Sequence, residues 1–266
     1  MYHGVDRVAP DADPHGLFVT PENFRAQVEW MLEAGFVPIS EDDYLAARAG
    51  RRALPRRAVL ITFDDGYAGL ANHAAPTLRS LGLPSVLYVP VGLLGGRTTW
   101  LPDGHRHALL SATDLRDLHA GGMAIGSHGC DHADLTTVTE GDLRRQTADT
   151  RAVLAGILGD RVRTFAFPYG YHDARAREAV RDAGYDAAFA VHDPAGRFAI
   201  QRVDINATDT LRTFRIKLHG LYPAVRRSSR HAPRLRRLAH DIVGREPRSA
   251  DGHAPPGQVG AGRRSR

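Results

Sequence analysis

Residues 58–66 read Ala-Val-Leu-Ile-Thr-Phe-Asp-Asp-Gly, a run of apolar and β-branched residues followed by two acids and a glycine. A short continuous apolar run of this kind predicts a strand that is buried on both faces, as in a parallel sheet. Asp64 and Asp65 follow that strand directly. Active sites of parallel α/β folds are built at the carboxyl ends of the strands. The stretch therefore predicts both the type of sheet and a candidate site at its edge.

The rest of the chain alternates between helical and extended patterns around this strand. Thr20 and Pro21 have the residue types of an N-cap and a first helical position. Helices are expected at residues 21–34, 68–81, 111–120, 139–158, 173–183 and 209–220, and further strands at residues 85–89, 123–126, 164–167, 187–191 and 200–205. Repeated strand–helix units predict an all-parallel α/β fold, either a barrel or an open sheet.

The charge of the chain is unevenly distributed along its length. The net charge is +5, but the segment from Ala224 to the end holds eleven Arg and three acids, a balance of +8, so residues 1–223 carry −3. This basic segment has no aromatic residue that could stack on a nucleic-acid base, and Pro and Gly interrupt it. We expect a domain over residues 1–222, followed by a disordered, solvated tail over residues 223–266 that does not bind nucleic acid.

Composition limits the classes of protein to which this chain can belong. No run of about 18 apolar residues is present, so no transmembrane segment is expected. No basic and apolar signal peptide is visible at the start. The single cysteine, Cys130, excludes a disulfide framework within the chain.

Adjacent carboxylates at the end of a buried strand are costly, because they repel each other and must be desolvated. A bound cation would relieve both costs. Neighbouring side chains of an extended segment diverge, so one of Asp64 and Asp65 could hold a metal while the other acts on a reacting water. The alternative is a helix N-cap with an exposed partner.

A second polar segment, Ser127-His128-Gly129-Cys130-Asp131-His132, follows the strand expected at residues 123–126. Two His four residues apart lie on one face if the segment turns helically, close enough to share one ion. Singly, each would be a cap or surface residue. Cys130 is out of phase with them and is interpreted as a small buried filler. One carboxylate and two imidazoles leave open coordination positions, and they suit zinc, with cobalt, nickel or iron also accepted.

A third segment, Phe167-Pro168-Tyr169-Gly170, also stands at an expected strand end. Such a turn can aim a backbone N–H at an oxyanion while the Tyr169 ring lines a sugar site. The alternative is a turn that serves only the structure.

Together the three segments resemble the polysaccharide deacetylase family, the NodB-homology carbohydrate esterases of family 4. Its T-F-D-D-G motif stands unaltered at residues 62–66. The resemblance implies that Asp64 is the catalytic base, that Asp65, His128 and His132 hold the metal, and that Pro168 and Tyr169 contact the substrate. Gly129 replaces the Ser or Thr usual in the family, which predicts weaker support of the ligand loop. Ala166 stands where the family has an Arg that orients the base, so that Arg is missing.

The family's general acid, a His in an L-x-H motif near the C-terminus, has no clear copy, because Lys217-Leu218-His219 lies within an expected helix. Met1-Tyr2-His3 is similar to the opening of the subgroup that deacetylates poly-N-acetylglucosamine, in which the barrel is permuted. We therefore assign the acid to His3, with His192 as the alternative. Trp100, in the Gly-rich segment 92–107, would either stack on a sugar or anchor the core.

The resemblance implies a distorted (β/α) barrel of about seven parallel strands and a metal-dependent hydrolase that removes N-acetyl groups from an amino-sugar polysaccharide. It implies one divalent ion, zinc by preference and cobalt or nickel otherwise, and a secreted or cell-envelope location, with a cytoplasmic one left open by the lack of a visible signal. Two other hypotheses stay open: a non-catalytic carbohydrate-binding relative, which the missing Arg favours, and an iron oxygenase with two His and one carboxylate.

Overall fold

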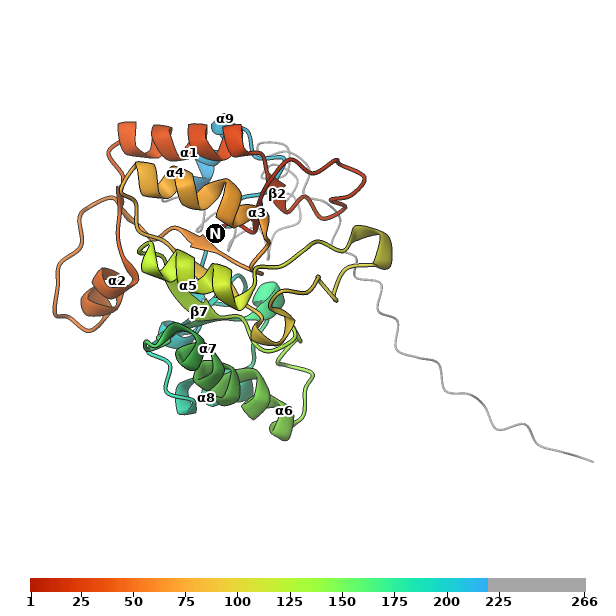
Figure 1. The fold of residues 1–266 in the computed structure, drawn as a ribbon. Helices are drawn as coiled ribbons and strands as arrows, with labels where there is room; N and C mark the ends of the chain where they lie inside the picture. The colour runs from red at the N-terminus through yellow and green to blue at the C-terminus, as the bar shows by residue number, and fades with distance from the viewer. Residues whose placement is uncertain (220–266) are drawn as a thin grey trace, which may run out of the picture.

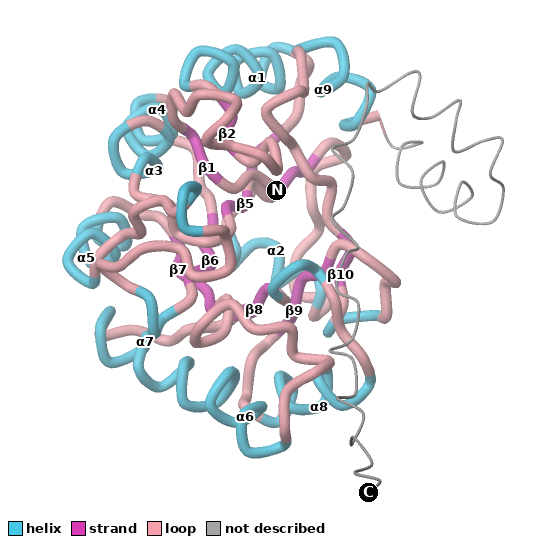
Figure 2. The backbone as a smooth tube through the Cα atoms, turned by 90° about the vertical axis from the view of Figure 1, so that its right-hand side faces the viewer, coloured by secondary structure: helices cyan, strands magenta, loops and turns pink. Residues whose placement is uncertain are grey.

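The main sheet of the protein has six parallel strands (Figure 1), which curl into a half-barrel (Figure 2). The computed structural model describes residues 1–219. Along the sheet the order is β10-β9-β8-β7-β6-β5. The strands are β5 (Thr62–Phe63), β6 (Val86–Val89), β7 (Ala124–Ser127), β8 (Thr164–Ala166), β9 (Ala187–Ala190) and β10 (Ile200–Gln201). Helices lie on the outside of the curved row of strands (Figure 2), which confirms the predicted parallel α/β fold.

The first residues of the chain link the two edges of this sheet. On one side Tyr2 donates its N–H to the carbonyl of Thr62 at 2.8 Å, and its own carbonyl accepts from Asp64 at 3.0 Å. On the other side the Met1 nitrogen donates to the carbonyl of Val203 at 2.8 Å. The carbonyl of Met1 accepts from Ile205 at 2.9 Å. The segment thus takes the place of a seventh strand, in agreement with the expected barrel of about seven.

The predicted helices are present, although two of them are divided, and several begin at a side-chain cap. The Thr20 hydroxyl accepts from the N–H of Asn23, and Ser111 and Asp114 form a reciprocal capping box. The helices are α1 (Pro21–Glu33), α2 (Glu41–Arg48), α3 (Gly69–Asn72), α4 (Ala74–Ser80), α5 (Ala112–Ala120), α6 (Glu140–Arg144), α7 (Thr150–Leu158), α8 (Ala174–Asp182) and α9 (Leu211–Leu218).

Three expected elements are divided in the structure. The single helix predicted at residues 68–81 is two helices, α3 and α4, which are separated at His73. The single strand predicted at residues 58–63 is wrong: β4 (Ala58–Val59) pairs with β3 (Val37–Pro38) in a separate sheet, and only β5 joins the main one. The chain changes pairing partner between them, because the carbonyl of Val59 accepts from Ile39 whereas that of Ile61 accepts from Val86. The long helix predicted at residues 139–158 is interrupted by a π-helical turn, η3 (Arg145–Asp149).

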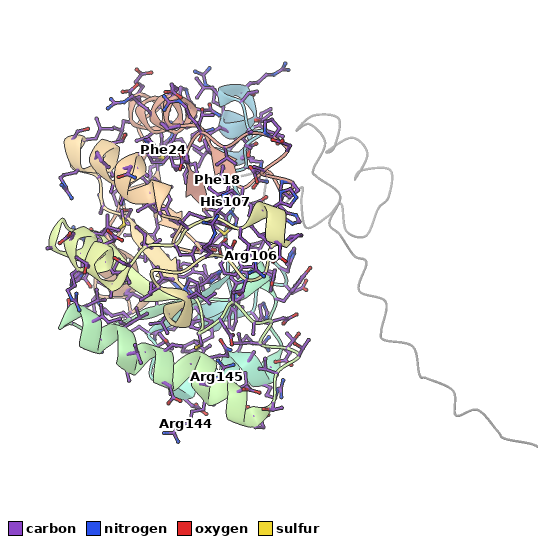
Figure 3. All side chains as sticks on the ribbon, turned by 45° about the vertical axis from the view of Figure 1, so that its right-hand side comes forward. Phe18, Phe24, Arg106, His107, Arg144 and Arg145 are labelled. Carbon is purple, nitrogen blue, oxygen red and sulfur yellow. The ribbon has the colours of Figure 1, made fainter. Side chains whose placement is uncertain are left out.

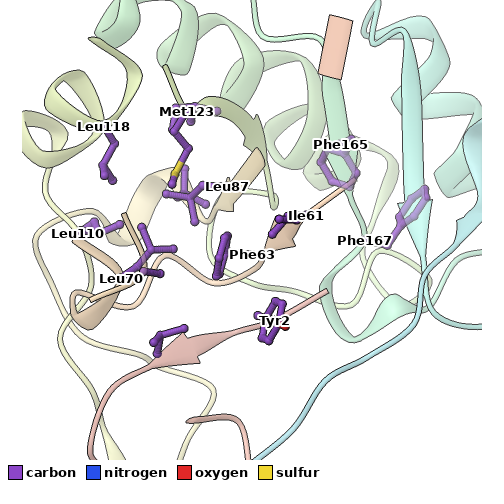
Figure 4. Packing of buried hydrophobic residues seen from close by; sticks show 14 of the residues in the cluster. Tyr2, Ile61, Phe63, Leu70, Leu87, Leu110, Leu118, Met123, Phe165 and Phe167 are labelled. Atoms are coloured by element: carbon purple, nitrogen blue, oxygen red, sulfur yellow. The ribbon is translucent and has the colours of Figure 1, made fainter. Parts of the chain in front are cut away.

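The core packs directly beneath the candidate site. Phe63 is fully buried, and the ring of Tyr2 stacks on it at 5.6 Å (Figure 4). Phe24 of α1 meets the ring of Tyr2 edge-on at 5.2 Å. The strand that leads into Asp64 is therefore anchored in a cluster of three aromatic rings, Tyr2, Phe24 and Phe63.

The predicted tail and its boundary at residues 222–223 lie outside the described residues. Within residues 1–219, no helix is both long enough and apolar enough to cross a membrane.

Candidate active site

The three polar segments meet at the carboxyl ends of strands of the main sheet: Asp64 and Asp65 follow β5, His128 follows β7, and Tyr169 lies just beyond β8. The backbone there is strained. Only four non-glycine residues of the described chain have positive φ, and three of them are Asp65 at 72°, His132 at 61° and Tyr169 at 58°. Such conformations cost free energy and gather at functional sites.

Asp65, His128 and His132 form a buried cluster with the spacing of metal ligands. Oδ1 of Asp65 lies 3.3 Å from Nε2 of His128 and 3.2 Å from Nε2 of His132. The three ligand atoms lie within 4.8 Å of one another. Atoms that bind one tetrahedral ion at about 2.1 Å lie about 3.4 Å apart, so the donor set and its spacing fit a single such ion.

The backbone fixes the tautomer of His128. Its Nδ1 lies 2.7 Å from the carbonyl oxygen of Ala166, which can only accept, so Nδ1 carries the hydrogen. Nε2, on the Asp65 side, is therefore the atom with the lone pair that a metal requires. Ala166 lacks the side chain of the expected Arg, but its backbone carbonyl orients this candidate ligand.

The cluster favours a carboxylate at Asp65. Burial opposes ionisation, but His132 and His128 outweigh it and hold the pKa of Asp65 well below its usual value. Burial also acts to lower the pKa of His128, yet the hydrogen bond to Asp65 raises it. For His132 burial prevails and the pKa is lowered. An anionic Asp65 and a neutral His132 are thus in the protonation states that bind a metal, whereas His128, whose pKa is raised, would release a proton on binding one.

The helical turn predicted for residues 128–132 is wrong. The segment is irregular, and it passes through left-handed backbone at Gly129, with φ of 79°, and at His132. These two turns, rather than helical spacing, bring the imidazoles together.

Gln146 of η3 supports the loop that carries the two candidate His ligands. Its Oε1 accepts from the N–H of Cys130 at 2.7 Å, and its Nε2 donates to Asp131 at 2.5 Å. A Cβ at Gly129 would lie only 2.8 Å from that Oε1, so the glutamine fills the space that a Ser or Thr would need. The predicted weakening of the loop is therefore offset. Cys130 is partly exposed, so its interpretation as a buried filler is wrong.

Gly129→Ser introduces the residue usual in the family, and we expect it to lower the free energy of unfolding by about 1–2 kcal/mol. The positive φ and the contact with Gln146 both oppose a side chain there. Denaturant unfolding measures the effect. Gly156→Ser is the matched control, because Gly156 lies within α7 with nothing near its Cβ position. Equal stability of the two variants would contradict the prediction.

Arg202 orients Asp64, and the sequence analysis did not identify it. Its two terminal nitrogens donate to Oδ1 and Oδ2 of Asp64 at 2.7 and 2.6 Å. The Arg202 side chain is only 6% exposed. Its guanidinium carbon lies 5.4 Å from the ring centre of Tyr88 and 5.8 Å from that of Phe189. The expected Arg at position 166 is thus replaced by one that reaches Asp64 from the end of β10. The only sequence signal was a charged residue inside an expected strand.

This pair keeps Asp64 ionised. Burial alone would raise the pKa of the carboxyl, but the charge of Arg202 outweighs it and lowers the pKa below its usual value. Asp64 is therefore a carboxylate near neutral pH, as a proton acceptor must be.

Arg202→Lys keeps a positive charge but loses the two-pronged contact, and we expect kcat/KM for acetate release to fall about 10- to 100-fold. Because Arg202 lowers the pKa of Asp64 and a base acts only above its pKa, the acid limb of the pH profile should move to higher pH. Arg163→Lys is the control, since Arg163 pairs with Asp186 away from the site. An unchanged acid limb in Arg202→Lys would contradict the role of Arg202.

His3 lies beside the paired carboxylates, close enough to influence the pKa of Asp64, of Asp65 and of His132. Its Nδ1 is buried and has no hydrogen-bond partner in the described chain. His192 instead stacks on Tyr171 at 5.2 Å, and His219 caps α9. The assignment of the acid to His3 remains a prediction that this position supports.

Two aromatic rings flank His132. Trp100 stacks on it at 4.0 Å with an interplanar angle of 20°, and Tyr169 meets it edge-on at 4.5 Å. The loop of Trp100 is held by His107, whose ring packs on Phe18 at 4.5 Å (Figure 3). Trp100 therefore covers a candidate ligand.

Comparison with known proteins places the chain among deacetylases. A family described as "Polysaccharide deacetylase" matches residues 51–188. A poly-beta-1,6-N-acetyl-D-glucosamine N-deacetylase of Staphylococcus aureus (strain MRSA252) is 21% identical over 188 residues, 66% of this chain and 62% of that protein. One of Escherichia coli (strain K12) is 35% identical over 91 residues, but these are 34% of this chain and 13% of that protein.

Solved structures share the fold. The Streptococcus pyogenes deacetylase PplD in complex with acetate matches with a TM-score of 0.71 at 20% identity, over 82% of this chain and 96% of that one. IcaB from Ammonifex degensii matches with a TM-score of 0.66 at 25% identity, over 77% of this chain and 89% of that one.

Proposed function

The chain belongs to the polysaccharide deacetylase family, and from that premise we propose that it removes N-acetyl groups from an amino-sugar polysaccharide by hydrolysis. The observation that carries the proposal is a cluster of three metal-ligating side chains, Asp65, His128 and His132, next to a carboxylate that Arg202 holds ionised. These residues would hold one divalent ion, for which zinc is the first candidate and cobalt and nickel are the next.

In such a site a bound ion makes water easier to deprotonate and polarises a carbonyl oxygen. Asp64 would accept the proton of the attacking water, because Arg202 leaves it charged at neutral pH. The backbone N–H of Tyr169, in its left-handed turn, would donate to the oxyanion that forms on the former acetyl carbonyl. His3 would protonate the amide nitrogen as the C–N bond breaks, giving acetate and a free amine.

The relatives point to a polymer as the substrate. Two of them are described as N-deacetylases of poly-β-1,6-N-acetyl-D-glucosamine, although the chain covers less than two thirds of either. We therefore propose an N-acetylglucosamine polymer of this kind for the present chain. A secreted or cell-envelope location, which the family resemblance implies, stays a prediction.

The two competing hypotheses lose their support. A non-catalytic carbohydrate-binding relative was favoured by the missing Arg, but Arg202 makes the contact with Asp64 that a catalytic base needs. An iron oxygenase with the same ligand types would be expected on a β-rich fold, whereas every strand pair within residues 1–219 is parallel and strands alternate with helices.

The direct test is acetate release from β-1,6- and β-1,4-linked N-acetylglucosamine oligomers, with zinc or cobalt added to metal-free protein. We expect acetate to be released in proportion to the bound metal, and not without it. Metal-loaded protein that releases no acetate from either series would contradict the proposed function.

A further inference from the structure

A row of aromatic rings leads outward from the ligand cluster. It starts with Trp100 stacked on His132 and continues to Tyr169, which meets His132 edge-on at 4.5 Å. Tyr171 lies next, with ring centres 6.4 Å from Tyr169 and nearly parallel planes, and His192 stacks on Tyr171 at 5.2 Å. The mechanism proposed above uses only the inner part of this row.

The outer part of the row faces solvent. Within residues 1–219 the exposed large hydrophobic side chains are Val37, Val153, Tyr169 and Tyr171, of which the two aromatic ones are neighbours. Tyr169 is 47% and Tyr171 is 44% exposed. Single exposed aliphatic residues need no explanation, but adjacent exposed aromatic rings beside a catalytic cluster are typical of a binding surface.

The two loops that carry these rings are fixed to each other. His172 sits between them: its Nδ1 accepts from Arg177 at 2.9 Å, so its Nε2 carries the hydrogen and donates to the carbonyl of His192 at 3.1 Å. Gly170 packs so closely that a Cβ there would lie 2.5 Å from Cβ of Val191. A surface that is fixed in advance loses little entropy when a ligand binds.

We propose that Tyr171 and His192, called here the outer ledge, bind the sugar unit adjacent to the one being deacetylated. The inference rests on the proposed function, because the inner end of the row is the catalytic cluster. Flat rings with a hydroxyl or nitrogen at the edge suit a pyranose, which has apolar C–H surfaces and polar groups around its rim. The ledge gives the enzyme a preference for oligomers over the monosaccharide.

The test compares Tyr171→Ala with wild type on N-acetylglucosamine substrates from the monomer to the hexamer. We expect kcat/KM of wild type to rise with chain length, and that of Tyr171→Ala to fall about tenfold on the hexamer, with no change on the monomer. Tyr171→Phe should keep most of the preference, because it keeps the ring. Val153→Ala is the matched control, since Val153 is 51% exposed, slightly more than Tyr171, but lies on α7.

The outcomes distinguish failure of the outer-ledge proposal from failure of the proposed function on which it rests. If wild type releases no acetate from any substrate, the proposed function fails, and the ledge with it. If wild type is active and Tyr171→Ala keeps the full gain with chain length, or loses activity equally on monomer and hexamer, the ledge alone is overturned. Binding of the hexamer to Asp64→Asn, measured by calorimetry, should also weaken about tenfold when Tyr171→Ala is added.

Discussion

Asp64→Asn should lower kcat for acetate release by about 1,000-fold while metal content and the fold remain as in wild type. Asn has the size of Asp and keeps an oxygen that can accept from Arg202, but it cannot take a proton from water. The proposed role of Asp64 is confined to that proton, since the proposed metal ligands are Asp65, His128 and His132. The loss should therefore appear in kcat far more than in KM.

Three measurements distinguish this role from a structural one: steady-state acetate release, metal content by elemental analysis, and the melting temperature. Asp186→Asn is the matched control, because Asp186 also pairs with an arginine, Arg163, at 2.9 Å but outside the site. It should leave kcat unchanged. An Asp64→Asn variant with more than about a tenth of wild-type kcat would remove Asp64 from the role of base.

Removal of the metal is expected to abolish acetate release, and zinc or cobalt should restore it. His128→Ala should weaken metal binding by at least about 100-fold, because even residues that only orient a ligand change affinity by 10- to 100-fold. His128 is buried and held by Ala166 through Nδ1, so its loss also removes an oriented donor. The measurement is competition with a chromogenic chelator, which does not depend on activity.

His119→Ala is the control for that experiment. His119 lies 3.4 Å from Asp160 and so forms a His–carboxylate pair outside the cluster, and its loss should not change metal affinity. Full activity after exhaustive chelation, or unchanged metal affinity in His128→Ala, would contradict the assignment of the ligands.

The candidate ligands could be predicted from sequence because their signals are local. A buried strand followed by Asp64 and Asp65 defines its own end, and two histidines after another strand indicate a shared ion. Arg202 could not be found in this way. It is 138 residues from its partner, and the position that the resemblance assigns to an Arg holds Ala166. Only the closed sheet brings the end of β10 against Asp64.

The same difference, between local signals and contacts distant in sequence, explains which parts of the fold could be predicted. Helix caps such as Thr20 and Ser111 act within three residues, so the helix starts were predictable. The exchange of partners between β4 and β5 depends on β3 and β6, which are distant in sequence, so the local pattern of residues 58–63 indicates a single strand. The π-turn at Arg145–Asp149 places Gln146 against the ligand loop, a tertiary contact that no local pattern indicates.

The contacts of the segment Met1–His3 determine when, during synthesis of the chain, the proposed catalytic groups can reach their positions. Met1 bonds to Val203, 202 residues away, and to Ile205. During synthesis at about 5–20 residues per second, these first residues would wait on the order of ten seconds or more for their partners. The backbone partners that position the segment of His3 and the Arg202 guanidinium that binds Asp64 become available together, when residues 202–205 have left the ribosome. A nascent or truncated chain that ends before them would therefore lack both proton-transfer groups in working position, so activity is expected only after residues 202–205 have been synthesised.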